Sequence, residues 1–179
     1  MSYSKDSEKA KIFYKENEAK IKDLFTGDLY TLEFDNDKLG VLFDQLASTD
    51  LVLINKNKQI YGVAMRINFS KHMHDKVTIR YKRHSGTKTE YEKTVQSFKN
   101  KSFNSVYGIQ CNSQNNVLVK SIQYDRLDLF RKIEMNKEKI LSENLKRAYE
   151  KCRVKYNSYL EFNFDFFKEN NIKHKILTY

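Results

Sequence analysis

Asp50-Leu-Val-Leu-Ile-Asn55 and Ile60-Tyr-Gly-Val-Ala-Met-Arg-Ile-Asn68 are two β-rich runs separated by a short polar segment. Two such runs joined by a turn-like loop predict a β-hairpin. The next run, residues 76–83, alternates apolar and basic side chains. Because successive residues of a strand point to opposite faces, it predicts a third strand with Val77, Ile79 and Tyr81 on one face and Arg80 and Lys82 on the other.

Helical patterns surround these strands. Apolar spacing predicts helices over residues 4–25 and 35–47, with a short strand at 29–34 between them. Thr87 and Thr89 each precede a glutamate by three residues, a capping-box pattern that opens a helix ending near residue 100.

The remainder of the chain predicts a second hairpin and a helical end. Residues 105–112 and 117–124 form the hairpin, and residues 125–155 form a long helical region in which Asn136 is a candidate break. Residues 159–167 alternate as an edge strand or a packed tail. The order predicts one mixed α/β domain over 1–179, with a single central mixed sheet flanked by helices and a helical C-terminal region (125–158) packed on it.

The composition is that of a folded chain. Hydrophobic residues make up 40% and include 12 Phe and 12 Tyr, which is enough apolar surface for a core. The chain has neither an apolar run long enough to span a membrane nor a signal-like N-terminus. Cys111 and Cys152 are expected to be reduced and buried. We therefore expect a cytoplasmic protein without a membrane partner.

Positive charge is concentrated in the middle of the chain. Residues 66–101 carry 10 basic and 3 acidic side chains, whereas residues 1–65 carry 9 basic and 11 acidic ones. Such a local field attracts polyanions, because each neutralised phosphate releases counterions. We predict DNA or RNA as the partner, with a solvated lysine-rich surface as the competing explanation. The predicted contacts are Arg66, Arg80, Lys82, Arg83, Lys88 and Lys93.

The predicted hairpin has a spacing that phosphodiester chemistry uses. Asp50 opens one strand, and Ala64-Met65-Arg66 lies where a carboxylate-x-lysine pair would share its sheet face. In this respect residues 35–130 resemble the PD-(D/E)XK, or restriction-endonuclease-like, nuclease superfamily. The resemblance maps the metal-binding Asp onto Asp50, the Glu onto Ala64 and the Lys onto Arg66. Ala64 cannot bind metal and Arg66 is a poor proton shuttle, so two of the three positions depart from the pattern.

The resemblance implies Mg²⁺ as a cofactor if a second acid replaces the missing one. Some members of the superfamily carry that acid on the following helix, where Glu90 is the candidate here, and Asp44 is another. In an active enzyme Asp50 and Glu90 would hold Mg²⁺ and Arg66 would stabilise the phosphorane. Helix capping after Thr87 explains Glu90 equally well.

Other local patterns are more typical of phosphate binding, a surface loop or a core than of nucleotide hydrolysis or a metal site. The segment Ser85-Gly-Thr-Lys-Thr89 lacks the first glycine of a Walker A loop, but its backbone N–H groups can assist phosphate binding. Tyr81 fits a core position better than a base-stacking one. His72 and His74 are typical of a surface loop, and the Phe162–Phe167 group is typical of a core or an oligomer contact.

Three functions remain open from the sequence. The first is a nucleic-acid-binding protein of nuclease-like fold, with or without Mg²⁺-dependent endonuclease activity. The second is a non-catalytic phage or mobile-element inhibitor of host defence, such as an anti-CRISPR, that binds a host nucleoprotein effector. The third is a basic surface that meets an acidic protein.

Overall fold

The computed structural model describes residues 3–31, 49–70, 75–100, 105–149 and 156–179. Its helices are α1 (Tyr3–Lys22), α3 (Glu90–Lys99), α4 (Arg126–Met135), α5 (Lys137–Asn144) and α6 (Phe164–Glu169). Its strands are β1 (Gly27–Thr31), β2 (Leu51–Asn55), β3 (Ile60–Ser70), β4 (Lys76–Lys82), β5 (Ser105–Gln114), β6 (Val117–Asp125), β7 (Leu145–Tyr149), β8 (Tyr156–Asn163) and β9 (His174–Thr178). The predicted helix over 35–47, with Asp44, the His72–His74 segment and Cys152 lie outside the described residues. No helix in these ranges is long and apolar enough to cross a bilayer.

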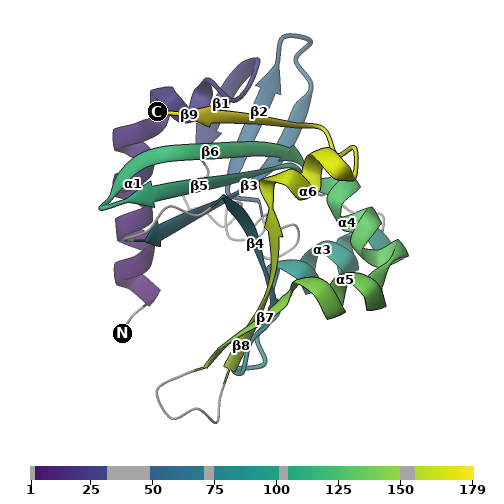
Figure 1. Ribbon diagram of the computed structural model, residues 1–179. Coiled ribbons are helices and arrows are strands. Elements are labelled where there is room, and N and C mark those ends of the chain that lie inside the picture. The colour runs from purple at the N-terminus through teal and green to yellow at the C-terminus, as the bar shows by residue number, and fades with distance from the viewer. Residues whose placement is uncertain (1–2, 32–48, 71–74, 101–104, 150–155) are drawn as a thin grey trace.

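The predicted hairpin over residues 50–68 is confirmed as β2 and β3, which pair antiparallel within a six-stranded sheet. The strand order of this larger sheet is β1-β2-β3-β5-β6-β9 (Figure 1). Among the strands in the described ranges, β3 and β5 are the one parallel pair, and parallel neighbours require a crossover, which here contains β4 and α3. The predicted second hairpin is also confirmed, as β5 and β6. Its turn uses Asn115 and Asn116 with φ values of 51° and 67°, a conformation that asparagine tolerates.

A smaller antiparallel sheet has the order β4-β8-β7. The mixed α/β class is therefore confirmed, but the strands divide between two sheets, so the prediction of one central sheet holds only for the larger. The prediction failed because β4 pairs with β8, which is distant in the sequence: Lys76 lies opposite Asn163. A pairing between such distant segments produces no local pattern in the sequence. In Figure 1 the β7–β8 ribbon projects away from the rest of the molecule.

The two faces of the larger sheet contribute to two hydrophobic cores. Alternate residues of β3, from Val63 to Phe69, pack with Phe13, Ile21 and other apolar residues of α1. On the other face, Ile122 and Tyr124 of β6 join a core built from β4, β8 and helices α3 to α6. Figure 1 accordingly has α1 on the side of the larger sheet away from α3, α4 and α5. Strand alternation places Ala64, Arg66 and Asn68 on this second face.

The C-terminal predictions need correction. The helical region expected over 125–155 ends at Asn144, and Leu145 and Tyr149, expected on its inner side, lie in strand β7. The expected strand over 159–167 ends at Asn163, and it is the middle strand of its sheet instead of an edge. The phenylalanines that follow form α6, in which Phe164 and Phe167 are buried, so their assignment to the core is confirmed. Strand β9 was not predicted.

Candidate nucleic-acid interface

Asp50, Ala64 and Arg66 share one face of the larger sheet. Leu51 lies opposite Val63 in the β2–β3 pair, so the next position along brings Asp50 opposite Ala64. Arg66 follows two residues later and therefore points to the same side. This is the arrangement expected from the sequence spacing.

Asp50 links the open end of the β2–β3 hairpin through two hydrogen bonds. Its Oδ2 accepts the backbone N–H of Met65 at 2.7 Å, while the backbone N–H of Asp50 donates to Val63 O at 2.9 Å. The side chain is half-buried. Asp50 thus fastens β2 to β3 directly beside Arg66.

Glu90, the other predicted catalytic acid, is the first residue of α3. The capping box is formed by Thr89 and Glu92, so capping by Thr87 does not account for Glu90. Its two oxygens instead face guanidinium groups, Oε2 at 3.7 Å from Arg66 Nη1 and Oε1 at 3.4 Å from Arg126 Nη2. The structure therefore joins two predicted site residues, Arg66 and Glu90, through an ion pair.

Arg126, at the start of α4, is fully buried and was not identified from the sequence. Its Nη2 donates to Thr94 Oγ1 at 2.6 Å, and its Cζ lies 4.7 Å from the centroid of the Phe130 ring. Its Nε and Nη1 have no hydrogen-bond acceptor in the described part of the chain. A buried cation this incompletely satisfied depends on Glu90 for charge compensation.

Tyr124 lies between the larger sheet and the charged cluster formed by Arg66, Glu90 and Arg126. It lies opposite Gly108, where a Cβ atom would collide with the tyrosine ring, so glycine makes room for Tyr124 over β5. Burial, with Glu90 as the next cause, raises the pKa of the Tyr124 hydroxyl. Tyr124 therefore stays neutral and does not compete with Glu90 for the two arginines.

The residues at these positions do not fit a Mg²⁺ ion. Magnesium requires carboxylate oxygens free to coordinate it, but both oxygens of Glu90 face arginines, and Ala64 has no oxygen on its side chain. Within the described ranges, no group of three or more His, Cys, Asp or Glu side chains could hold a metal ion.

Arg66 also contacts the smaller sheet. Its Cζ lies 5.5 Å from the centroid of the Tyr159 ring, a cation–π distance, and its side chain is 27% exposed. Burial lowers the pKa of Arg66, Glu90 opposes this, and the nearby charge of Arg80 lowers the pKa further. A guanidinium nevertheless stays protonated at neutral pH, so two positive charges remain close together here.

Tyr159 lies in the middle of a row across the smaller sheet. Arg80 on β4 and Lys146 on β7 are both its direct partners in the strand register, so all three side chains share one face. Arg80 and Tyr159 are half-buried and Lys146 is exposed. We call Arg66, Arg80, Lys146 and Tyr159 the basic face. The sequence predicted its first two members and missed the last two, which lie outside the charge-rich segment.

The other predicted contact residues are more dispersed. Lys82, expected on the same face as Arg80, is exposed at the end of β4, where the register shifts so that it pairs with Ser158 and not with a residue on the Tyr159 side; that expectation was wrong. Lys93 is half-buried on α3. In the loop between these elements, Arg83 Nη1 donates to Thr87 Oγ1 at 3.2 Å and Lys88 Nζ donates to Gln96 Oε1 at 2.5 Å. The register does not join these four to the basic face.

Two further side chains can be assigned. Tyr81 packs against the helix-side core with its ring centroid 4.8 Å from that of Tyr91, so its assignment to the core is confirmed. Cys111 is a free, buried thiol, as expected, and burial raises its pKa to about 12. It is therefore a poor nucleophile at neutral pH.

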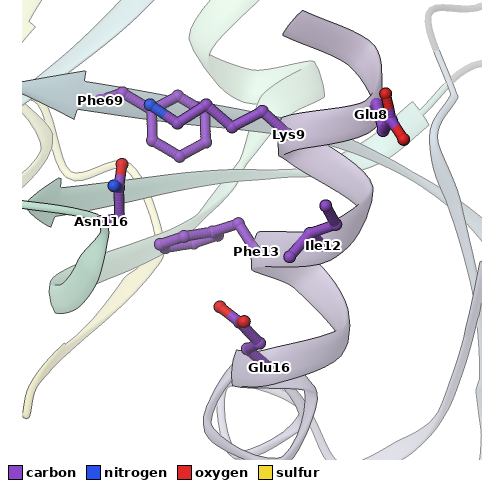
Figure 2. A pocket seen from close by; sticks show the side chains of 7 residues that line it. All are labelled: Glu8, Lys9, Ile12, Phe13, Glu16, Phe69 and Asn116. Atoms are coloured by element: carbon purple, nitrogen blue, oxygen red, sulfur yellow. The ribbon is translucent and has the colours of Figure 1, made fainter. Parts of the chain in front are cut away.

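A pocket of about 490 Å³ lies beside α1 and contains none of the predicted site residues (Figure 2). Lys9 extends over the Phe69 ring, with its Nζ 4.1 Å from the ring centroid. The full lining is Glu8, Lys9, Ile12, Phe13, Glu16, Phe69 and Asn116. Its two glutamates make it unsuited to a phosphate ligand.

Comparison with known protein families, curated proteins and solved structures finds no match to this chain. Functional inference therefore depends on the geometry of its own residues.

Proposed function

We propose that this chain binds nucleic acid through the basic face and does so without metal-dependent catalysis. The observation that carries the proposal is the convergence of Arg66, Arg80 and Lys146 around Tyr159 from strands of both sheets. Grouped arginines and lysines bind phosphates and fix the position of a nucleic-acid backbone.

Incomplete neutralisation of this face supports the proposal. Glu161 is two residues from Tyr159 on β8, but its Oε2 is already 3.2 Å from Lys76 Nζ. Within the described residues, Arg80 and Lys146 form no ion pair with a carboxylate. Their charges are therefore available to an external anion.

The arrangement of Asp50, Ala64 and Arg66 supports a restriction-endonuclease-like core over residues 35–130 as part of the same proposal. The hairpin carrying these positions is followed by α3 and by β5, which is parallel to β3. Because Ala64 cannot bind metal and Glu90 pairs with two arginines, we propose a degenerate scaffold that serves binding.

The test removes two charges from the basic face. We expect Arg80→Ala/Lys146→Ala to weaken binding of short DNA and RNA oligonucleotides, measured by fluorescence anisotropy between about 50 and 200 mM salt. If both side chains contact phosphates of a single strand, the slope of log K against log salt falls by about 1.4. Lys15→Ala/Lys168→Ala, which removes two exposed charges from α1 and α6, is the matched control. Equal losses in the two variants would contradict the proposal.

Incubation of supercoiled plasmid with Mg²⁺ or Mn²⁺ tests the absence of catalysis. We expect no nicking by the wild-type protein. Nicking that disappears in Asp50→Ala would instead establish a metal-dependent nuclease and refute the non-catalytic part of the proposal.

A further inference from the structure

We infer that Tyr159 stacks with an unpaired base, so that the ligand of the basic face is single-stranded nucleic acid. This inference rests on the proposed function and specifies its substrate class. Two features carry it: the position of Tyr159 among the cations and the fixed position of Arg66.

Tyr159 is an aromatic ring with a cation on either side. Strands in a sheet are about 4.8 Å apart, so Arg80 and Lys146 extend from backbones roughly 10 Å apart, with Tyr159 midway between them. A nucleotide that places its base on the ring would thus have cations within reach of phosphates on both sides. Base stacking combined with a cationic groove is how proteins bind single strands without reading their sequence.

Arg66 is held in place beneath this row. Its guanidinium lies beside the Tyr159 ring, and its partner Glu90 is held in turn by the fully buried Arg126. Thr94 fixes Arg126 from the same helix that carries Glu90. Arg66 beside the Tyr159 ring is therefore held by the successive contacts of Glu90, Arg126 and Thr94. Little side-chain conformational entropy remains to be lost when a ligand binds.

A base face available to a protein ring indicates a single strand and not a duplex. In a duplex the faces of the bases are covered by their neighbours, and only base edges are exposed in the grooves. A tyrosine that stands on a sheet face between two neighbouring strands can reach a base face only if the base is unstacked. Sheet-borne aromatic residues contact unpaired bases in this way.

The first experiment compares a short thymidine oligonucleotide with an abasic strand of the same length, so that the phosphates are equal and only the bases differ. We expect wild-type protein to bind the thymidine strand about 5- to 150-fold more tightly, the range for stacking of one base. In Tyr159→Ala the two affinities should become equal, and in Tyr159→Phe the difference should persist.

Tyr30→Ala is the matched control, since Tyr30 is 52% exposed on β1 and lies outside the basic face. It should leave both affinities unchanged. Circular dichroism and thermal unfolding check that each variant folds. If Tyr159→Ala does not fold, the wild-type comparison of thymidine and abasic strands decides alone.

The outcomes separate the two proposals. No detectable binding to any nucleic acid would refute the proposed function. Binding that depends on Arg80 and Lys146 but is equal for abasic strand, thymidine strand and duplex would leave that function intact and overturn the stacking inference. A preference for duplex that is unchanged by Tyr159→Ala would also overturn it.

Discussion

At the scale of single residues, the least replaceable group in the cluster is Glu90. It is the carboxylate that faces Arg126, whose side chain is fully buried and has two nitrogens without acceptors among the described residues. Removing one partner of a buried ion pair leaves the other charge uncompensated in a medium of low dielectric constant.

We therefore expect Glu90→Ala to lower the free energy of unfolding by about 3–5 kcal/mol. Urea denaturation followed by circular dichroism measures this. The double variant Glu90→Ala/Arg126→Leu should recover most of the loss, because it removes the isolated charge as well. If the single variant were as stable as wild type, Glu90 would not be the compensating group.

The sequence predicted only those residues of the basic face that belong to a local pattern of spacing or charge. Arg80 was identified because it belongs to a strand with clear alternation, and Arg66 because it lies at the position of the lysine in a carboxylate-x-lysine pair; both belong to the segment with a basic excess. Lys146 and Tyr159 meet Arg80 only through the pairing of β4, β8 and β7, and no local pattern encodes that pairing. Arg126 follows the end of β6 and resembles any exposed arginine until the packing of α3 against α4 buries it.

At the scale of elements, α3 illustrates both the success and the ambiguity of a local signal. The sequence predicted a capping box but offered two threonines for it, Thr87 and Thr89. The structure uses the buried Thr89, whose backbone N–H bonds to Glu92 Oε2 at 2.8 Å. Thr87 lies outside the helix and is exposed. Burial, which the sequence does not reveal, decides between the two.

We expect Thr89→Ala to destabilise the protein by about 1 kcal/mol, the usual cost of losing an N-cap side chain. Thr87→Ala should change stability by less than about 0.5 kcal/mol and is the matched control. Thermal and urea unfolding of both variants provide the comparison. Because Glu90 is the residue after the cap, Thr89→Ala should also weaken the proposed binding of nucleic acid by the basic face. A larger loss in Thr87→Ala would reverse the assignment of the cap.

The C-terminal elements were predicted poorly for a different reason. Residues 145–149 continue an apolar spacing that suits a helix, yet they form β7 beside β8. The alternation of Phe162 and Phe164 continues across a boundary at which the strand ends and α6 begins. In both places tertiary pairing overrides the local preference, which is weak in short elements.

At the scale of the whole molecule, the two cores lie on opposite sides of the larger sheet. Phe13 of α1 packs in one core and Phe162 of β8 in the other, and both are almost fully buried. The sheets are also joined by the buried side chain of Gln110, whose Oε1 accepts from the Thr78 N–H at 3.3 Å and whose Nε2 donates to Arg66 O at 3.4 Å. Both cores therefore depend on the larger sheet. Loss of one core would expose one face of this sheet and so destabilise the core on its other face.

This coupling predicts one cooperative unfolding transition for the chain. Phe13→Ala and Phe162→Ala should each lower the free energy of unfolding by about 3–5 kcal/mol, and each should shift the entire transition without splitting it. Because the chain has no tryptophan, its tyrosine fluorescence can be followed directly. The urea unfolding curves from circular dichroism and from tyrosine fluorescence should coincide. If Phe13→Ala instead produced an intermediate that retained the helix-side core, the two sides of the larger sheet would be separate folding units. Unfolding of the unit containing β3 would then remove Arg66 from the basic face even where Arg80, Lys146 and Tyr159 stay folded on β4, β7 and β8, and the proposed binding should weaken.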